Sequence, residues 1–350
     1  MKQVTSNSTR RMPRLRAGDV VEVLSAREIL ATLDDKGELE NLPFMPEMLR
    51  YCGQRMTVHK VAHKLCEIIT GEGGLLWMNN AVHLTGARCD GGSHGGCETA
   101  CSFYWKEAWL WRVSPEGRDI DRISSLADDA NVDLSVIERA TKKQPDVDGS
   151  ERFSCQATEI LRATSGRIRF WDLNQYVADL RTRNVGLFGV IRTIVFRLFN
   201  VYQDLSRRVF PPWLLIKEGL PWGFVKGTAR GQTPIRNLDL RVGEVVRIRS
   251  KDEIGSTLSA KRLNRGLGFE EEQARECGKT ARVSRRVERC IDEKTGKMLT
   301  MKNPCIVLEG IVCRGIYHGN CPREYVPFWR ETWLERVNSP AKQTSANGKS

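Results

Sequence analysis

CDGGSHGGCETACSFYWKEAWLWRV occupies residues 89–113, and CRGIYHGNCPREYVPFWRETWLERV occupies residues 313–337. Of these 25 aligned positions 11 are identical, and the identities include cysteine, histidine, glycine and tryptophan. Chance does not place so many identities at one offset, so the chain contains an internal repeat.

The repeat continues upstream of both stretches. At an offset of 225 residues, Ser25 and Glu28 match Ser250 and Glu253. One residue is then lost, and an offset of 224 places Cys66 on Cys290. Further matches pair Gly18 with Gly243, Leu42 with Leu267, Phe44 with Phe269, Glu47 with Glu272, Cys52 with Cys277 and Leu84 with Leu308. The sequence therefore predicts two related units around a different middle region.

These matches divide the chain into six predicted parts. They are a basic disordered tail at 1–17, a Cys-rich β unit at 18–113, an acidic linker at 114–150, a helical basic middle region at 151–241, a second Cys-rich β unit at 242–337 and a disordered tail at 338–350. Helical periodicity in the middle region is found at 159–162, 171–180 and 187–205.

Each unit begins with a predicted strand followed by a short helix. Residues 18–23 alternate between apolar and polar side chains, which favours a strand, and Ser25 with Glu28 forms the capping box that opens a helix. Residues 55–65 and 81–88 are further predicted strands. We expect an α+β fold with two homologous small β-barrels, SH3-like and each with an inserted helix, on either side of a helical middle region.

Pairs of tryptophans close both units. Trp105 and Trp109 are four residues apart, as are Trp329 and Trp333, which suits one face of a helix. We interpret the four rings as core anchors that close each unit, with a ligand-stacking surface as the alternative.

The net charge of the chain is uneven. The chain has 55 Lys and Arg against 43 Asp and Glu, which gives +12. The first unit has 9 basic and 13 acidic residues, whereas the second has 19 and 14. A pair of nucleic-acid modules needs a basic face in both, because phosphate neutralisation supplies much of the affinity. We therefore expect a protein partner and no nucleic acid.

The sequence also indicates a cellular compartment. No stretch reaches the roughly 18 uncharged apolar residues of a membrane span, and residues 1–16 lack the apolar core of a signal peptide. We therefore expect a cytoplasmic protein, in which thiols stay reduced. The odd number of cysteines, 11, is a poor disulfide framework, so clustered cysteines are interpreted as metal ligands or catalytic groups.

Residues 89–101 combine thiols and an imidazole with four glycines. The candidate metal ligands are Cys89, His94, Cys97 and Cys101, together with Cys66 on the preceding predicted strand. Thiolate and imidazole are the preferred ligands of zinc, and glycines let a short loop fold around an ion. The spacing therefore predicts a metal site in the first unit.

The second unit keeps most of these candidates. They are Cys290, Cys313, His318 and Cys321, whereas Tyr325 replaces Cys101. The shared positions give a Cys3His set in each unit, which is the ligand count of a structural zinc site. An iron–sulfur cluster is an alternative in the first unit, although the spacing matches neither familiar ferredoxin pattern. Without a metal, the same residues would be reduced, buried cysteines lining a small core.

Two carboxylates of the first unit have no acidic counterpart in the second. Asp90 and Glu98 are therefore the candidate general bases if the first unit is catalytic, acting on a metal-bound water. The sequence contains no Gly-rich phosphate loop, nucleophile elbow or His-Glu-x-x-His motif.

The segment 186–208 is apolar but contains arginines. Arg192 and Arg197 argue against a span, and Arg207 and Arg208 follow them. Such a helix can lie in an anionic membrane surface with its apolar side inserted. The alternative is a buried helix of a small α-domain.

Several phrases resemble a family of duplicated, Cys-rich bacterial proteins. They are LPFMPEM at 42–48, HLTGARCDG at 83–91, FYWKEAWL at 103–110 and NPCIVLEG at 303–310. The resemblance implies a link to polysaccharide or natural-product biosynthesis genes and assigns no residue roles. We therefore expect a zinc-binding accessory or scaffold protein of a bacterial biosynthetic pathway, peripheral to the membrane through 186–208. A metalloenzyme or iron–sulfur redox protein with its centre in the first unit is the alternative.

Overall fold

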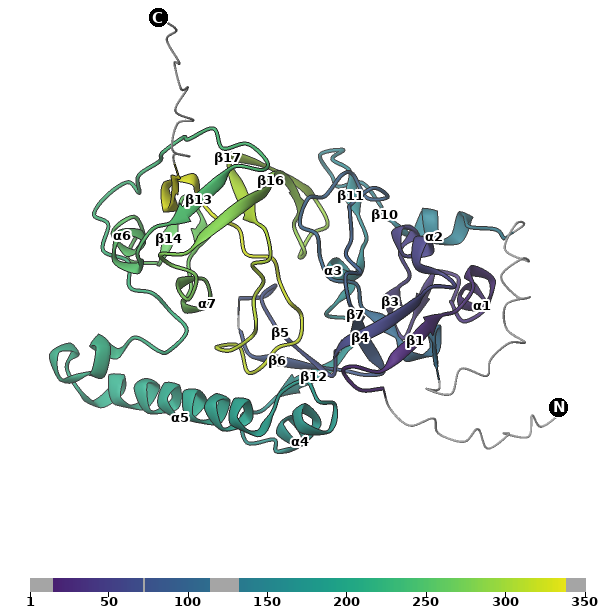
Figure 1. The fold of residues 1–350 in the computed structure, drawn as a ribbon, viewed down its shortest axis with the longest axis horizontal. Coiled ribbons are helices and arrows are strands. Elements are labelled where there is room, and N and C mark those ends of the chain that lie inside the picture. The colour runs from purple at the N-terminus through teal and green to yellow at the C-terminus, as the bar shows by residue number, and fades with distance from the viewer. Residues whose placement is uncertain (1–14, 72, 114–131, 338–350) are drawn as a thin grey trace, which may run out of the picture.

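The computed structural model describes residues 15–71, 73–113 and 132–337 (Figure 1). Helices and antiparallel sheets occur together, so the expected α+β class is confirmed. Residues 1–14 of the predicted N-terminal tail, the predicted C-terminal tail and residues 114–131 of the predicted acidic linker lie outside the described residues, whereas Leu15 near the end of the predicted N-terminal tail is buried.

The N-terminal sheet has five strands in the order β8-β7-β4-β1-β9. Its strands are β1 (Val20–Val23), β4 (Arg55–Val61), β7 (Ala81–Leu84), β8 (Trp105–Lys106) and β9 (Leu110–Arg112). Beyond it, β5 (Lys64–Cys66) and β6 (Leu75–Met78) form a hairpin that pairs with β12 (Thr164–Ile168) of the middle region. The hairpin therefore belongs to a separate three-stranded sheet.

The C-terminal sheet has four strands in the order β17-β16-β13-β18. Its strands are β13 (Val245–Ile248), β16 (Thr280–Ile291), β17 (Met298–Leu308) and β18 (Leu334–Arg336). β16 and β17 form one long hairpin, with two register shifts, where the N-terminal region has the separate pairs β4-β7 and β5-β6.

Strand register agrees with the offsets of the sequence repeat. Val58 of β4 is opposite Leu84, and Val283 of β16 is opposite Leu308. Cys66 is opposite Leu75 and Cys290 is opposite Leu299. The edge strands β8 and β9 are not paired with each other, so each region forms a half-barrel sheet and the narrower expectation of a closed, SH3-like barrel is not confirmed.

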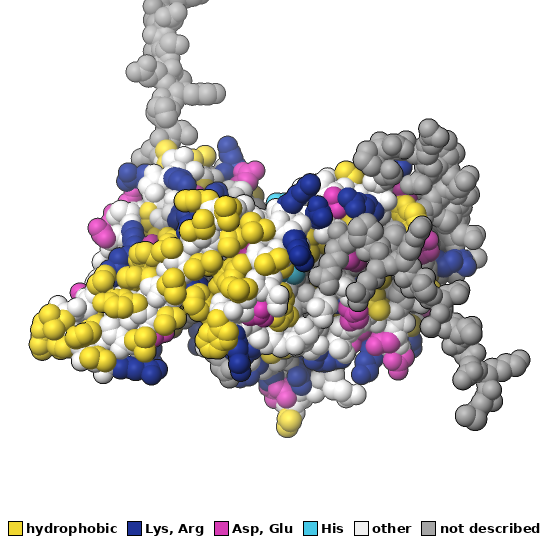
Figure 2. All heavy atoms as spheres, turned by 90° about the horizontal axis from the view of Figure 1, so that it is seen from below, with side chains coloured by type: hydrophobic (Ala, Val, Ile, Leu, Met, Phe, Trp, Pro, Cys, Tyr) yellow, Lys and Arg dark blue, Asp and Glu magenta, His cyan; other side chains and the backbone are white. Residues whose placement is uncertain are grey.

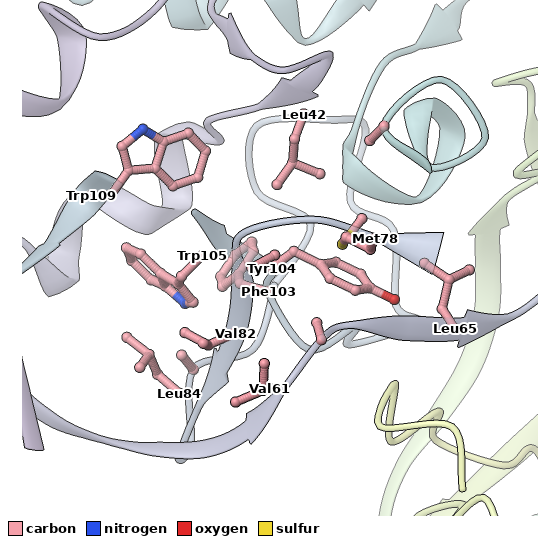
Figure 3. Close-up of a cluster of buried hydrophobic side chains, with 14 of the residues drawn as sticks. Leu42, Val61, Leu65, Met78, Val82, Leu84, Phe103, Tyr104, Trp105 and Trp109 are labelled. Atoms are coloured by element: carbon pink, nitrogen blue, oxygen red, sulfur yellow. The ribbon is translucent and has the colours of Figure 1, made fainter. Parts of the chain in front are cut away.

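The four tryptophans fill the two cores. Trp105, Trp109, Trp329 and Trp333 are all fully buried, which agrees with their interpretation as core anchors. The expected helix is wrong, because Trp105 lies in β8 and Trp329 in an isolated β-bridge with Ile306, whereas Trp109 and Trp333 end the short 3-10 turns η2 (Glu107–Trp109) and η6 (Glu331–Trp333). Figure 3 shows the N-terminal core, where Trp105, Phe103, Val82 and Leu84 face one another.

Short helices cover these sheets. The capping box at Ser25 opens α1 (Ala26–Leu30), and the one at Ser250 opens α6 (Lys251–Ser256). The indole N–H of Trp109 donates to Thr32 Oγ1 (3.0 Å) beyond α1, and that of Trp333 donates to Thr257 Oγ1 (2.9 Å) beyond α6. Each inserted helix is therefore fixed to a core tryptophan.

The remaining elements are short, apart from α5. They are α2 (Ser135–Ala140), α3 (Gln156–Glu159), α4 (Asn174–Arg181), α5 (Leu187–Val209), α7 (Glu271–Ala274), η1 (Pro46–Tyr51), η4 (Pro212–Leu214), η5 (Ile216–Gly219) and the strand pairs β2-β3 (Glu38–Leu39, Leu42–Pro43), β10-β11 (Lys142–Lys143, Arg152–Phe153) and β14-β15 (Leu263–Asn264, Leu267–Gly268). The predicted linker thus contains α2 and β10 in its described part, and α5 extends the predicted helix at 187–205 by one turn.

Candidate metal centre

The loop 89–101 is held in a tight conformation by its glycines. Gly91 has φ +76°, and a Cβ there would lie 2.1 Å from the carbonyl oxygen of Cys97. The N–H groups of His94 and Gly96 both donate to the Gly91 carbonyl, and the Cys89 N–H donates to Cys101 O (2.9 Å). Only glycine fits at position 91, and the resulting turn folds the imidazole back toward the first cysteine.

The turn creates a buried set of three potential ligands. Glu47 from η1, Cys89 and His94 each offer one atom, and the three atoms lie within 4.8 Å of one another. His94 Nε2 is 3.5 Å from Cys89 Sγ, and His94 Nδ1 is 3.0 Å from Glu47 Oε1. Within the described structure, Glu47 Oε2 is buried without a hydrogen-bond partner, whereas His94 Nδ1 faces Glu47 Oε1. An unsatisfied carboxylate oxygen beside a thiol and an imidazole fits a bound cation.

Glu47 is charged in this setting. Burial raises the pKa of its carboxyl, but the neighbouring His94 ring and the Ser93 N–H (2.9 Å) outweigh burial and hold the pKa at about 2. A carboxylate behind the imidazole is the usual way to orient a metal-binding histidine.

More thiols line the same small cavity. Its volume is about 30 Å³, and its walls include Cys89, His94, Cys97, Cys101 and Cys155. The Cys97 thiol is 3.2 Å from Thr99 Oγ1. Burial raises the pKa of Cys155 to about 11. The cavity has room for one ion or one water and for no larger ligand.

The loop 313–325 has the same backbone. A Cβ at Gly315 would lie 2.4 Å from the Cys321 carbonyl oxygen, and the His318 N–H donates to Gly315 O (3.1 Å). The imidazole has a different partner, however, because His318 Nε2 is 2.8 Å from Glu270 Oε2. Burial lowers the pKa of His318, but Glu270 outweighs it and the net shift is upward.

The two cysteines of the hairpins lie at unexpected places. The Cys66 N–H donates to Cys321 Sγ (3.0 Å), and Cys290 packs against the cluster of Cys97, Phe153 and Ile291. Burial raises the pKa of Cys321, but hydrogen bonds from Cys66 and from the Arg323 N–H outweigh it and lower the pKa to about 6. Each hairpin cysteine therefore lies beside the loop of the other terminal region, whereas the sequence analysis grouped it with the loop of its own unit.

The two candidate general bases are engaged away from the cavity. Asp90 pairs with Arg50 at 2.5 Å, and both side chains are about half exposed. Glu98 Oε2 accepts from the N–H groups of Glu288 (2.6 Å) and Arg289 (2.9 Å) on β16. Neither carboxylate belongs to the buried ligand set in the described chain.

Sequence reasoning missed two residues of this centre. Glu47 had a usable signal, because it matches Glu272 in the repeat, whereas Cys155 has no counterpart. A separate buried ion pair was also missed. Lys64 Nζ is 2.7 Å from Asp179 Oδ2 of α4, and His63 Nε2 is 3.1 Å from Asp179 Oδ1. His63 lines a cavity of about 610 Å³.

Comparison with protein-family models, with curated proteins and with solved structures finds no match to this chain. The chemistry of the centre is therefore argued from its own geometry.

Proposed function

We propose that the protein is a metal-binding scaffold in which the loop 89–101 holds a structural zinc ion. The observation that supports this most directly is the buried set of Glu47, Cys89 and His94. In this proposal Cys89, His94 and Cys97 are ligands, and Glu47 orients the His94 ring. A cytoplasmic location and a role in a bacterial biosynthetic pathway stay predictions from the sequence.

The size of the cavity favours a structural ion over a catalytic one. A structural zinc ion is enclosed by four protein ligands, whereas a catalytic ion keeps a position open for water or substrate. A cavity of about 30 Å³ surrounded by thiols leaves no such position.

Metal analysis of the full chain tests the proposal. We expect a colourless protein that carries zinc, and a chelator should lower its melting temperature by about 5 °C or more, because the free energy of metal binding is free energy of folding. His94→Ala should lose zinc, whereas the control Cys277→Ser, beside Lys251 and Glu271 and outside both loops, should keep it. A metal-free wild-type protein would refute the proposal.

A second candidate function is an iron–sulfur or metal-dependent redox protein. It is favoured by the thiols of Cys101 and Cys155, which line the cavity in addition to the ligands of a zinc site. Purification without air and an absorption spectrum separate the two functions, since a cluster is brown and zinc is colourless. If the protein holds a cluster, Cys101→Ser should remove its colour. If it holds a structural zinc ion, Cys101→Ser should leave the zinc bound.

We further propose that α5 attaches the scaffold to an anionic membrane surface. Its polar residues Thr193, Gln203 and Ser206 are buried against the protein, and Gln203 donates to Ile216 O (2.6 Å). Nine of its apolar residues face outward and form the apolar ridge, namely Leu187, Phe188, Ile191, Val195, Leu198, Val201, Tyr202, Leu205 and Val209 (Figure 2). Of the described helices none is long and apolar enough to span a bilayer.

The flanks of the apolar ridge support lipid as the occupant. Residues 181–217 contain seven basic residues and one acidic residue. Trp213 is 81% exposed at the C-terminal end and Phe188 is 78% exposed at the N-terminal end. Basic and aromatic residues at the edges of an apolar face are typical of helices that lie in the membrane interface.

Vesicle sedimentation tests the attachment. The full chain should sediment with vesicles that contain phosphatidylserine and less with neutral vesicles, and added salt should weaken binding. The double variant Leu198→Glu/Leu205→Glu should not sediment. The control Val147→Glu/Ile235→Glu changes two exposed apolar residues elsewhere and should still bind. Equal sedimentation of both double variants would refute the attachment.

A further inference from the structure

We propose that the protein has two zinc sites and that each takes its fourth ligand from the opposite terminal region. One site comprises Cys313, His318 and Cys321 with Cys66, and the other comprises Cys89, His94 and Cys97 with Cys290. The inference rests on the proposed function, because it assumes that the two Gly-rich loops bind metal. Its new content is the second site and the exchange of the two hairpin cysteines.

The position of Cys66 carries the argument. Cys66 ends β5, and its N–H donates to Cys321 Sγ at 3.0 Å. A cavity of about 250 Å³ is lined by Cys66, Cys313 and His318. Figure 1 shows β5 and β6 beside the yellow C-terminal loop. Three of the four proposed ligands thus surround one cavity, and the fourth touches Cys66.

The fit of the hairpin onto the loop is close. A Cβ at Gly319 would lie 2.7 Å from Leu75 Cδ1, which is opposite Cys66 in the hairpin. Glycine at 319 therefore lets the loop 313–325 approach β6.

The opposite contact involves the repeat counterparts but differs in detail. Cys290 near the end of β16 packs against the cluster of Cys97, Phe153 and Ile291, and the N–H of the adjacent Ile291 points at Cys97 Sγ (3.5 Å). A Cβ at Gly95 would lie 2.5 Å from Phe153 Cζ and 3.0 Å from Met298 Cε at the start of β17. Gly95 and Gly319 differ by the repeat offset of 224, so a glycine at the same position of each loop faces the hairpin of the other region.

Charged groups fix the two regions to each other around these contacts. Glu324 Oε1 is 2.5 Å from His59 Nε2 and 3.4 Å from Lys60 Nζ on β4. The Glu98 N–H donates to Arg289 O (3.0 Å) on β16. The hairpin cysteines are therefore held at the opposite loops before any ion binds.

The proposed chemistry needs no reactant besides the ion. Zn²⁺ binding to three thiols and one imidazole releases thiol protons to solvent, and the imidazole coordinates as the neutral ring. In the site formed by Cys313, His318, Cys321 and Cys66, the His318 ring must leave Glu270 in order to coordinate the ion. With both ions bound, each ion joins ligands from the two terminal regions of the chain, so the metals fasten the N-terminal region to the C-terminal region.

Double variants separate the exchanged ligand sets from sets within one unit. Purified full-length proteins are equilibrated with Zn²⁺ and a chelator at a level that leaves two ions on the wild type, and bound zinc is counted by mass spectrometry of the intact protein. Cys66→Ser/His318→Ala removes two ligands of one site and should keep one ion. Cys66→Ser/His94→Ala damages both sites and should keep none. The control Cys277→Ser lies beside Lys251 and Glu271, outside both loops, and should keep two.

Each other result overturns the inference in a distinct way. The reversed pattern, with one ion kept by Cys66→Ser/His94→Ala, would place Cys66 in the first site. A wild type with a single ion that His318→Ala keeps would refute the second site and leave the proposed function standing. A wild type without zinc would refute both.

Alkylation of the wild type repeats the test without a variant that must fold. As a chelator removes the ions in steps, Cys66 should become reactive together with Cys313 and Cys321. Cys290 should become reactive together with Cys89 and Cys97. Joint exposure of Cys66 with Cys89 would overturn the exchange.

Discussion

The loops 89–101 and 313–325 share a backbone but use their histidines differently. His94 lies 3.5 Å from Cys89 with Glu47 on its other nitrogen, whereas His318 is 2.8 Å from Glu270. The repeat therefore preserves the turn that places the imidazole, and the nearby carboxylate decides what the imidazole faces. Backbone geometry and ligand chemistry are separate properties of the two regions.

The largest expected effect comes from removing the shared turn. Gly91→Ala would place a Cβ 2.1 Å from the Cys97 carbonyl at a positive φ, so we expect a loss of about 3 kcal/mol or more in the free energy of unfolding. Gly315→Ala should cost a similar amount. Gly96→Ala has a positive φ but no atom within 4 Å of its Cβ, so it should cost about 1 kcal/mol. Urea unfolding of the metal-free proteins measures this, and equal costs at 91 and 96 would break the comparison.

The next largest effect concerns the carboxylate beside each of the two histidines. Glu47→Gln should weaken zinc binding by about 10- to 100-fold, because the carboxylate no longer orients His94. Glu270→Gln should instead strengthen binding severalfold, because His318 no longer gives up an ion pair to reach the ion. Competition with a chromogenic chelator gives both affinities. Weaker binding in both variants would mean that Glu270 supports the ion and does not compete with it.

Part of this centre could be predicted from the sequence. The cysteine and histidine spacing with its glycines located both loops, because a glycine-dependent turn and its ligands lie within a dozen residues. The partner of Cys66 could not be predicted in the same way. In an antiparallel hairpin, Val58 is opposite Leu84, so moving forward to Cys66 moves away from Cys89 by up to roughly 25 Å of strand. The cysteines have the same spacing in both units. The sequence therefore cannot distinguish a Cys66 that reaches the loop of its own unit from a Cys66 that reaches the loop of the other unit.

The face of α5 that packs against the protein also could not be predicted from the sequence. Periodicity shows that a helix has an apolar face, but it does not show which face meets the protein. Gln203 and Asn200 decide this in the structure, since Gln203 bonds to Ile216 O and Asn200 donates to Trp222 O (3.1 Å). Those contacts depend on the path of the chain after Val209, and the prolines at 211 and 212 indicate that the helix ends there but not where the chain then goes.

A smaller effect concerns the ion pairs of Glu324 with His59 and Lys60, which we call the clamp. Glu324 occupies the position of Ala100 in the first loop. Burial raises the pKa of Glu324, but His59 and Lys60 outweigh it and hold the pKa at about 2. A lowered carboxyl pKa stabilises the fold above the unfolded value near 4.5, and this stability is lost as the pH falls from there toward 2. Glu324→Gln should therefore cost about 2 kcal/mol at pH 7 and almost nothing near pH 2. The pH dependence of urea unfolding measures it.

The matched control for the clamp is Glu309→Gln, whose carboxylate is 68% exposed and 3.9 Å from Arg282. It should change stability by less than about 0.5 kcal/mol at any pH. A cost at Glu324 that stays constant down to pH 2 would show that the clamp does not depend on the carboxylate charge.

The smallest effect separates Asp90 from the metal. Asp90 occupies the position of Arg314 in the second loop, and its pair with Arg50 is about half exposed on both sides. An exposed pair contributes little, so Asp90→Asn should cost about 0.5 kcal/mol in urea unfolding and leave the zinc content unchanged. His94→Ala, in the same loop, is the positive control for zinc loss. If Asp90→Asn also loses zinc, the Asp90 carboxylate contacts the ion in the zinc-bound protein. The two loops would then bind the ion differently, because the second loop has arginine at this position.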